Sequence, residues 1–102
     1  MIKTRPRDYL TRDTLLCQLA EESAELAQAA LKERRTLTND NPTPISYADA
    51  RNNLIEEVAD VFVCLSELLE IRDWEEVANI REQKENRWLR RLEGRKNNET
   101  AL

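Results

Sequence analysis

The sequence predicts an all-α protein that forms one small helical domain. Of its 102 residues, 35% are charged, and only one is glycine and three are proline. An all-β fold needs many turns rich in glycine and proline, whereas charged residues mixed with alanine and leucine are typical of amphipathic helices. Apolar residues also recur three and four positions apart over most of the chain, which is the helical period.

Breakers and capping residues divide the chain into three expected helices. Residues 1–10 are predicted to form a flexible arm, and the helical domain is predicted to span residues 11–93. The first helix of this domain is expected at about 11–35, and a Pro- and Asn-rich loop follows it at 36–45. Ser46 is the predicted N-cap of a second, buried central helix that reaches about residue 71. Asp73 and Glu76 have capping-box spacing for a third helix at 74–92. Gly94 is expected to end it, leaving a disordered tail at 94–102.

Composition excludes several classes of function. The net charge is −4 and aromatic residues do not alternate with basic ones, so we expect no nucleic-acid partner. The absence of histidine excludes His-based zinc sites, Ser-His triads and ferritin-like di-iron centres. No apolar run is long enough to cross a membrane and no signal peptide is visible, so we expect a cytoplasmic protein. Cys17 and Cys64 are interpreted as reduced core thiols.

Carboxylates occur where the faces of the helices should be apolar. Glu22 lies at the edge of the leucine face of the first helix, and Glu57 shares a stripe with core residues of the second. An amide and two carboxylates follow i, i+4, i+7 spacing on both helices: Gln18, Glu22 and Glu25, then Asn53, Glu57 and Asp60. Most helical glutamates are solvated, and five are interpreted that way: Glu21, Glu33, Glu56, Glu67 and Glu70. Glu57 is different, because carboxylates are rarely buried without a partner.

If these two pairs of carboxylates face each other, they need a cation or protons between them. Two carboxylates about 5 Å apart repel by roughly 3 kcal/mol at an effective dielectric constant near 20, so four close groups cost on the order of 20 kcal/mol. That exceeds the net stability of a typical domain, about 5–15 kcal/mol. Oxygen ligands select a hard ion, here Mg²⁺ with Mn²⁺ as a substitute. Mg²⁺ usually keeps water and substrate phosphates as further ligands, which indicates phosphate chemistry.

The third helix carries the opposite charge. Lys84 lies between Ile80 and Trp88 on the apolar stripe, with Arg87 on the flank. A lysine at the edge of an apolar stripe is commonly structural, with its ammonium group in water. Beside an acidic metal site, however, a lysine and an arginine suit the oxygens of a triphosphate.

Four segments of the chain, taken in their order along the sequence, resemble the MazG-like branch of the all-α nucleoside triphosphate pyrophosphatases. The resemblance is strongest to the small bacterial and phage forms of that branch. The resemblance covers residues 10–93 and is carried by LAEESAELAQAA (19–30), NPTP (41–44), NLIEEVADV (53–61) and KENRWLRRL (84–92). That family's signature is Glu-x-x-Glu on one helix and Glu-x-x-Asp on the next, followed by a basic helix. Trp88 departs from the pattern, which favours a polar residue there, and is interpreted as a subunit contact.

The resemblance implies a fold, a ligand set and a reaction. The fold is a helical bundle whose four-helix core is completed in a homodimer or homotetramer. The implied metal ligands are Glu22, Glu25, Glu57 and Asp60, and the implied phosphate-binding residues are Lys84 and Arg87. The implied reaction is cleavage of an NTP or dNTP between its α and β phosphates, giving the monophosphate and pyrophosphate.

The expected mechanism is attack on phosphorus by a metal-activated water, with Glu22, Glu57 and Lys84 as the catalytic residues. Gln18 and Asn53 are placed to present amides to the base or sugar. The general base stays open between Glu21 and one of the metal ligands. The alternative function is a non-catalytic helical interaction or regulatory module with a structural cation site.

Overall fold

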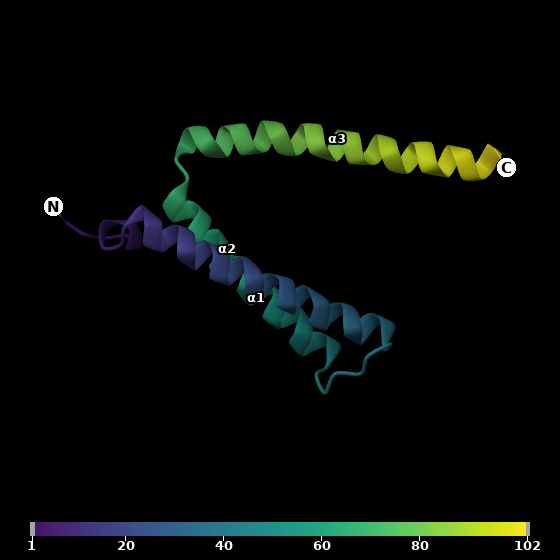
Figure 1. Cartoon of the computed structure of the whole chain (residues 1–102), viewed down its shortest axis with the longest axis horizontal. Helices are drawn as coiled ribbons and strands as arrows, with labels where there is room; N and C mark the ends of the chain where they lie inside the picture. Colours follow the sequence, from purple (N-terminus) through teal and green to yellow (C-terminus); the bar gives the residue numbers. More distant parts are fainter. Residues whose placement is uncertain (1, 102) are drawn as a thin grey trace. The chain divides into compact units, whose positions relative to one another are not determined.

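The computed structural model describes the backbone of residues 2–101 and the side chains of residues 2–95. This part of the chain contains a 3₁₀ turn, η1 (Pro6–Asp8), and three α-helices, α1 (Arg12–Thr38), α2 (Tyr47–Leu68) and α3 (Ile71–Ala101), and no strand (Figure 1). The predicted all-α class is therefore confirmed. The chain divides into two units, Met1–Leu68 with η1, α1 and α2, and Leu69–Leu102 with α3. Among the described residues, no helix is both long and apolar enough to cross a membrane.

Side-chain and backbone caps set the ends of α1. The helix begins close to the predicted position because Thr11 Oγ1 accepts a hydrogen bond from Thr14 N at 3.2 Å. It ends after Thr38, three residues later than predicted, where Asn39 adopts a left-handed conformation with φ 55°. The Asn39 N–H then donates to Arg35 O at 2.9 Å and satisfies one of the last carbonyl groups.

The predicted N-cap of α2 is confirmed, whereas the start of α3 differs from the prediction. Ser46 Oγ accepts from Asp49 N at 3.1 Å. α2 ends at Leu68, and α3 already begins at Ile71. Asp73 therefore lies in the first turn of α3 and not before it, and its Oδ2 accepts from Glu70 N at 2.9 Å.

The C-terminal part of the chain also differs from the prediction. The backbone of α3 continues through Gly94 to Ala101, so Gly94 does not end the helix. A single glycine in a helix costs only about 1 kcal/mol relative to alanine, and it stops a helix only where the backbone turns left-handed. The predicted disordered tail began at this residue, and its last residue, Leu102, lies outside the described part of the chain.

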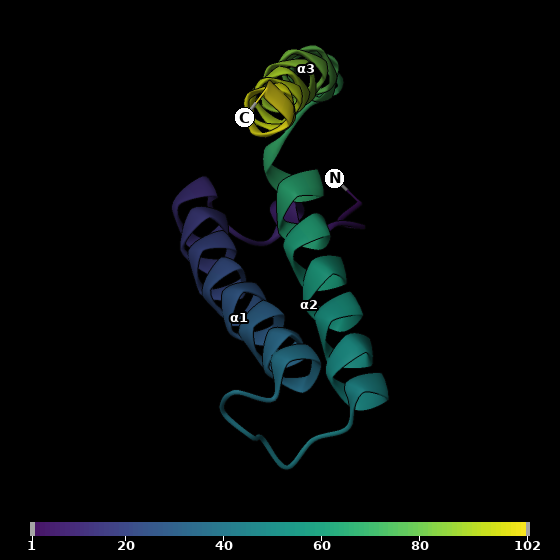
Figure 2. The same ribbon diagram turned by 90° about the vertical axis from the view of Figure 1, so that its right-hand side faces the viewer.

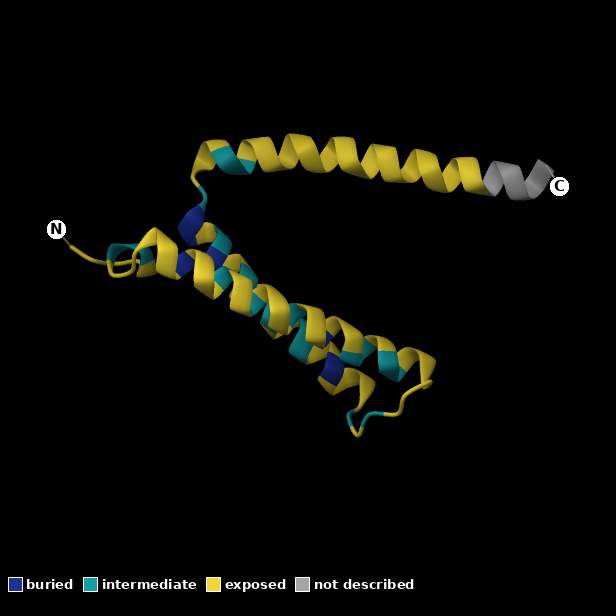
Figure 3. Ribbon diagram, viewed as in Figure 1, coloured by how far each residue is buried: buried dark blue, intermediate teal, exposed yellow. Residues whose placement is uncertain are grey.

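α1 and α2 form an antiparallel hairpin and lie side by side along their length (Figure 1, Figure 2). The buried residues of this hairpin are spread along both helices, between half-buried and exposed positions (Figure 3). They are Leu15, Ala29, Ala50, Cys64, Glu67 and Leu68. Cys64 is buried as predicted, but Cys17 is exposed, because it lies about 200° around α1 from the buried Leu15. α2 is not a buried central helix in this chain, since Ile55 and Val63 on its outer side are more than half exposed.

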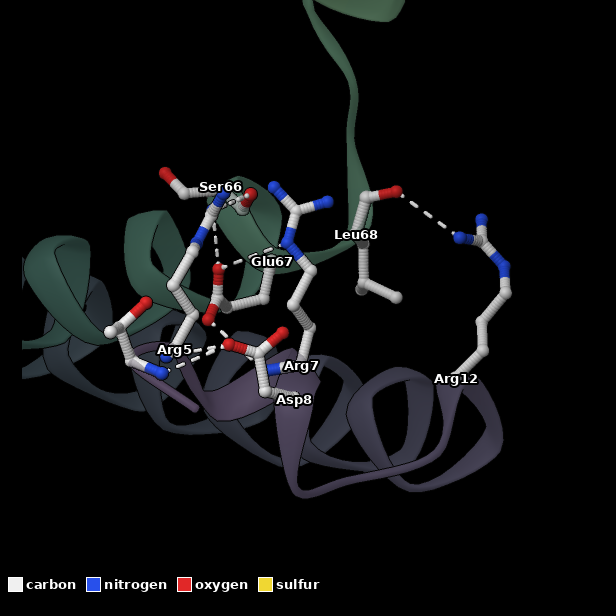
Figure 4. A network of polar contacts seen from close by, with 8 residues as sticks. Arg5, Arg7, Asp8, Arg12, Ser66, Glu67 and Leu68 are labelled. Carbon is white, nitrogen blue, oxygen red and sulfur yellow. Dashed lines mark hydrogen bonds and ion pairs between the residues drawn. The ribbon is translucent and has the colours of Figure 1, made fainter. Parts of the chain in front are cut away.

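The N-terminal segment packs on the end of α2 and is anchored by Glu67, which is only 7% exposed (Figure 4). Arg5 Nη2 donates to Glu67 Oε2 and, at 2.9 Å, to Ser66 O. The Arg7 backbone N–H donates to Glu67 Oε1 at 3.2 Å. Arg12 Nη1 adds a bond of 3.2 Å to Leu68 O. The arginines thus satisfy carbonyl groups that the end of a helix leaves without donors.

These contacts differ from two sequence-based expectations. The segment predicted to be a flexible arm contains a defined turn, and Asp8 stabilises that turn by accepting from Thr4 N at 3.0 Å and Arg5 N at 3.1 Å. The two bonds hold the pKa of Asp8 below its ordinary value. Glu67 was expected to be solvated, and this prediction is wrong, because its partners lie about sixty residues earlier in the sequence.

We predict that Glu67→Ala lowers the free energy of unfolding by about 2 kcal/mol, because it removes a buried carboxylate from two donors. Urea denaturation followed by circular dichroism measures the change. Glu56→Ala, the same substitution at an exposed position of α2, is the control and should change stability by less than about 0.5 kcal/mol. Equal losses in both variants would contradict a structural role for the Arg5–Glu67 contact.

Candidate metal centre

The α1–α2 hairpin brings three of the predicted metal ligands together. Glu22 and Glu25 lie on α1 and Glu57 on α2, and one carboxylate oxygen from each lies within 4.8 Å of the other two. The antiparallel arrangement explains this, because it sets the middle of one helix beside the middle of the other (Figure 2). We refer to these three side chains as the acidic cluster.

Burial makes two members of the acidic cluster unusual. Glu22 and Glu57 are half-buried, and the Oε2 atom of each is buried without a hydrogen-bond partner among the described residues. Glu33 Oε1 is also buried and not hydrogen-bonded, but Arg51 Nη1 lies 3.5 Å from it and balances its charge. Within the described part of the chain, Glu22 and Glu57 form no such ion pair. No ion pair among the described residues therefore balances the negative charge of these two side chains.

The position of Glu22 beside other carboxylates and partly inside the hairpin changes its pKa. Burial raises the pKa of Glu22 above its ordinary value of 4.5, and the negative charges of Glu25 and Asp60 raise it further. A hydrogen bond from Gln18 Nε2 to Glu22 Oε1, 2.8 Å long, acts in the opposite direction. Asp60 is exposed and does not belong to the acidic cluster, although its charge acts on Glu22. Its side chain is one methylene shorter than that of glutamate.

The acidic cluster fits a hard divalent cation. Its donors are all carboxylate oxygens, the ligands that Mg²⁺ and Mn²⁺ prefer. Two oxygens bound to the same Mg²⁺ lie at most about 4.2 Å apart, since each bond is about 2.1 Å long. The oxygens of the acidic cluster lie within 4.8 Å of one another, so they have to move closer together to share one ion. The unpartnered Oε2 atoms of Glu22 and Glu57 are the second observation in favour of a cation, because buried polar atoms normally have a partner.

The other predicted site residues lie on separate elements. Asn53 is half-buried on α2, one turn before Glu57. Lys84 and Arg87 lie on α3, in the second unit, and both are exposed. Lys84 was predicted to lie on an apolar stripe between Ile80 and Trp88. In the structure these three residues line one groove of about 470 Å³.

Cys64 lies near the acidic cluster, on the stripe of α2 that also contains Glu57. Burial raises the pKa of its thiol, and the charges of Glu22 and Asp60 raise it further. The available signal was spacing, since Cys64 follows Asp60 by one helical turn and Glu57 by two. The Glu33–Arg51 pair was missed, because Glu33 was interpreted as solvated and its partner belongs to the other helix.

We predict that Glu22→Gln raises the melting temperature of the metal-free protein at neutral pH. The folded-state pKa of Glu22 is raised, so its charged form is disfavoured on folding, and stability falls as the pH rises through that pKa. The difference between variant and wild type should disappear well below pH 4.5, the ordinary pKa. Thermal unfolding in excess chelator measures it, with Glu21→Gln at the exposed neighbouring position as control. A lower melting temperature for Glu22→Gln at neutral pH would contradict the uncompensated charge.

No family model, curated protein or solved structure matches this chain.

Proposed function

We propose that this protein is a Mg²⁺-dependent nucleoside triphosphate pyrophosphohydrolase that converts an NTP or dNTP to the monophosphate and pyrophosphate. The observation that supports this most is the acidic cluster, with two buried carboxylate oxygens that have no hydrogen-bond partner in the described part of the chain. A cluster of hard oxygen donors without histidine suits an ion that works on phosphates. The MazG-like order of motifs, Glu-x-x-Glu, Glu-x-x-Asp and a basic helix, supports the nucleotide as substrate.

The carboxylates have different roles in this proposal. Glu22 and Glu57 contribute the buried oxygens that hold the cation, and Glu25 adds an exposed oxygen at the edge of the cluster. Asp60 strengthens the negative field and offers a further ligand from the surface of α2. When bound, the cation supplies Lewis-acid polarisation of a phosphoryl oxygen and lowers the pKa of a water ligand.

The basic residues of α3 contribute the complementary charge. Lys84 and Arg87 bind the oxygens of the triphosphate in this proposal and stabilise the charge that develops on the leaving pyrophosphate. Lys84 lines an apolar groove and is exposed, so its ammonium group is accessible to an anion. Self-association as a homodimer or homotetramer belongs to the same proposal, and the exposed Ile55 and Val63 of α2 are the apolar surface that it would cover.

We predict that the purified protein releases pyrophosphate from at least one NTP or dNTP when Mg²⁺ is present, and that Glu57→Gln lowers this rate by about 100-fold or more. Glutamine has nearly the same shape but loses the charge that holds the ion. A panel of NTPs and dNTPs with a coupled pyrophosphate assay measures the rates. Glu56→Gln, which changes the exposed neighbouring residue, should keep full activity. Full activity of Glu57→Gln with unchanged helicity would overturn the catalytic assignment.

We also predict that Lys84→Ala lowers kcat/KM by roughly 10-fold to 100-fold, because one charged contact to the phosphates is lost in the transition state. Steady-state kinetics at saturating Mg²⁺ provides the measurement. Arg90→Ala is the matched control, since Arg90 lies on a different side of α3, and its kinetics should equal those of the wild type. Equal effects of both substitutions would indicate a general dependence on positive charge and not a phosphate site at Lys84.

A further inference from the structure

Gln18 donates a hydrogen bond to one member of the acidic cluster, Glu22. It lies one helical turn before Glu22 on α1, and its Nε2 donates to Glu22 Oε1 at 2.8 Å. The other oxygen of the same carboxylate, Oε2, is buried and has no hydrogen-bond partner in the described part of the chain. The two oxygens of Glu22 therefore have different surroundings, one held by an amide and one without a protein donor.

From this geometry we infer that Gln18 is a positioning residue, which orients the Glu22 carboxylate so that Oε2 remains available to a divalent cation. The inference rests on the cation site of the proposed function. It assigns Gln18 to the metal centre, whereas spacing alone suggested that its amide contacts the base or sugar of the nucleotide. Partners that hold metal ligands in place contribute substantially to affinity, because they fix the orientation of the ligand before the ion binds.

The chemistry of the amide suits this role. Gln18 is neutral, so it holds one oxygen of Glu22 without balancing the negative charge that attracts the cation. Glu33 shows the contrasting arrangement in the same hairpin, because Arg51 lies 3.5 Å from its oxygen and neutralises it. A carboxylate paired with a guanidinium has little charge left for an ion, whereas one that accepts from an amide retains it.

The corresponding amide on α2 has a different environment. Asn53 precedes Glu57 by one turn, as Gln18 precedes Glu22, but it does not donate to Glu57 Oε2, which is without a partner. Its side chain is one methylene shorter than that of glutamine, which shortens its reach along the helix. The repeated pattern of an amide and two carboxylates therefore has one oriented carboxylate, on α1, and the two helices contribute unequally to the site.

Titration of Mn²⁺, followed by the electron paramagnetic resonance signal of the free ion, tests the role of Gln18 without any nucleotide. Gln18→Met keeps the length of the side chain and removes the donor, so its Mn²⁺ affinity should fall about 10-fold. In a Glu22→Gln background, Gln18→Met should cause no further loss, because both substitutions affect one ligand. Gln28→Met is the matched control at an exposed position elsewhere on α1, and its affinity should equal that of the wild type.

Other results would overturn the assignment in distinguishable ways. Mn²⁺ affinity of Gln18→Met within about 2-fold of the wild type, with a raised KM for the nucleotide, would place Gln18 at the substrate. An additive loss in the double variant would show that Gln18 does not act through Glu22. A wild type that binds Mn²⁺ but releases no pyrophosphate would refute the proposed function and leave the role of Gln18 to be decided by the Mn²⁺ titration. A wild type that does not bind Mn²⁺ would refute both.

Discussion

The uncompensated charge between α1 and α2 is the constraint on which the rest of the hairpin depends. Glu22 and Glu57 carry buried oxygens at the middle of a helix pair whose buried apolar residues are few and partly as small as alanine. Like charges that lie close together repel each other, which opposes the packing of the two helices at this point. The ends of the hairpin counteract this with opposite charges. Arg5 pairs with the buried Glu67 at the end of α2, and Arg51 pairs with Glu33 nearer the loop that joins the helices. Paired charges therefore lie on both sides of a middle where the carboxylates lack cationic partners among the described residues.

The partners of each carboxylate, more than its burial, separate structural from functional glutamates in this hairpin. Glu67 is more buried than Glu22, yet it accepts hydrogen bonds from Arg5 and from the Arg7 backbone, and the guanidinium group of Arg5 balances its charge. Glu22 accepts one bond from a neutral amide and keeps its charge. Burying a charge is costly unless it is paired, so an unpaired charge persists where a ligand compensates for it. By this criterion, Glu22 and Glu57 are the residues of this hairpin that we propose as ligands of a cation.

Local patterns in the sequence were sufficient to predict much of this arrangement. The Ser46 cap and the position of Glu57 on a buried stripe depend on residues within one or two helical turns, so spacing alone predicts them. The same spacing selected all three residues of the acidic cluster. Burial of Glu67 depends on Arg5 and could not be inferred, because helical periodicity contains no information about partners about sixty residues away. The start of α3 was misplaced for a subtler reason, since an aspartate has similar capping preferences just before a helix and in its first turn.

The cation and the nucleotide of the proposed function rest on different features of the chain. Charge, burial and donor type lead to a hard cation, whereas the nucleotide follows from the order of motifs and from the basic residues of α3. The cation also links function to stability. An ion that binds only the folded state stabilises it by about 2.7 kcal/mol at a free concentration 100 times its dissociation constant. In the proposed function, the ion would therefore add stability to the folded hairpin at the place where Glu22 and Glu57 lack ion-pair partners among the described residues.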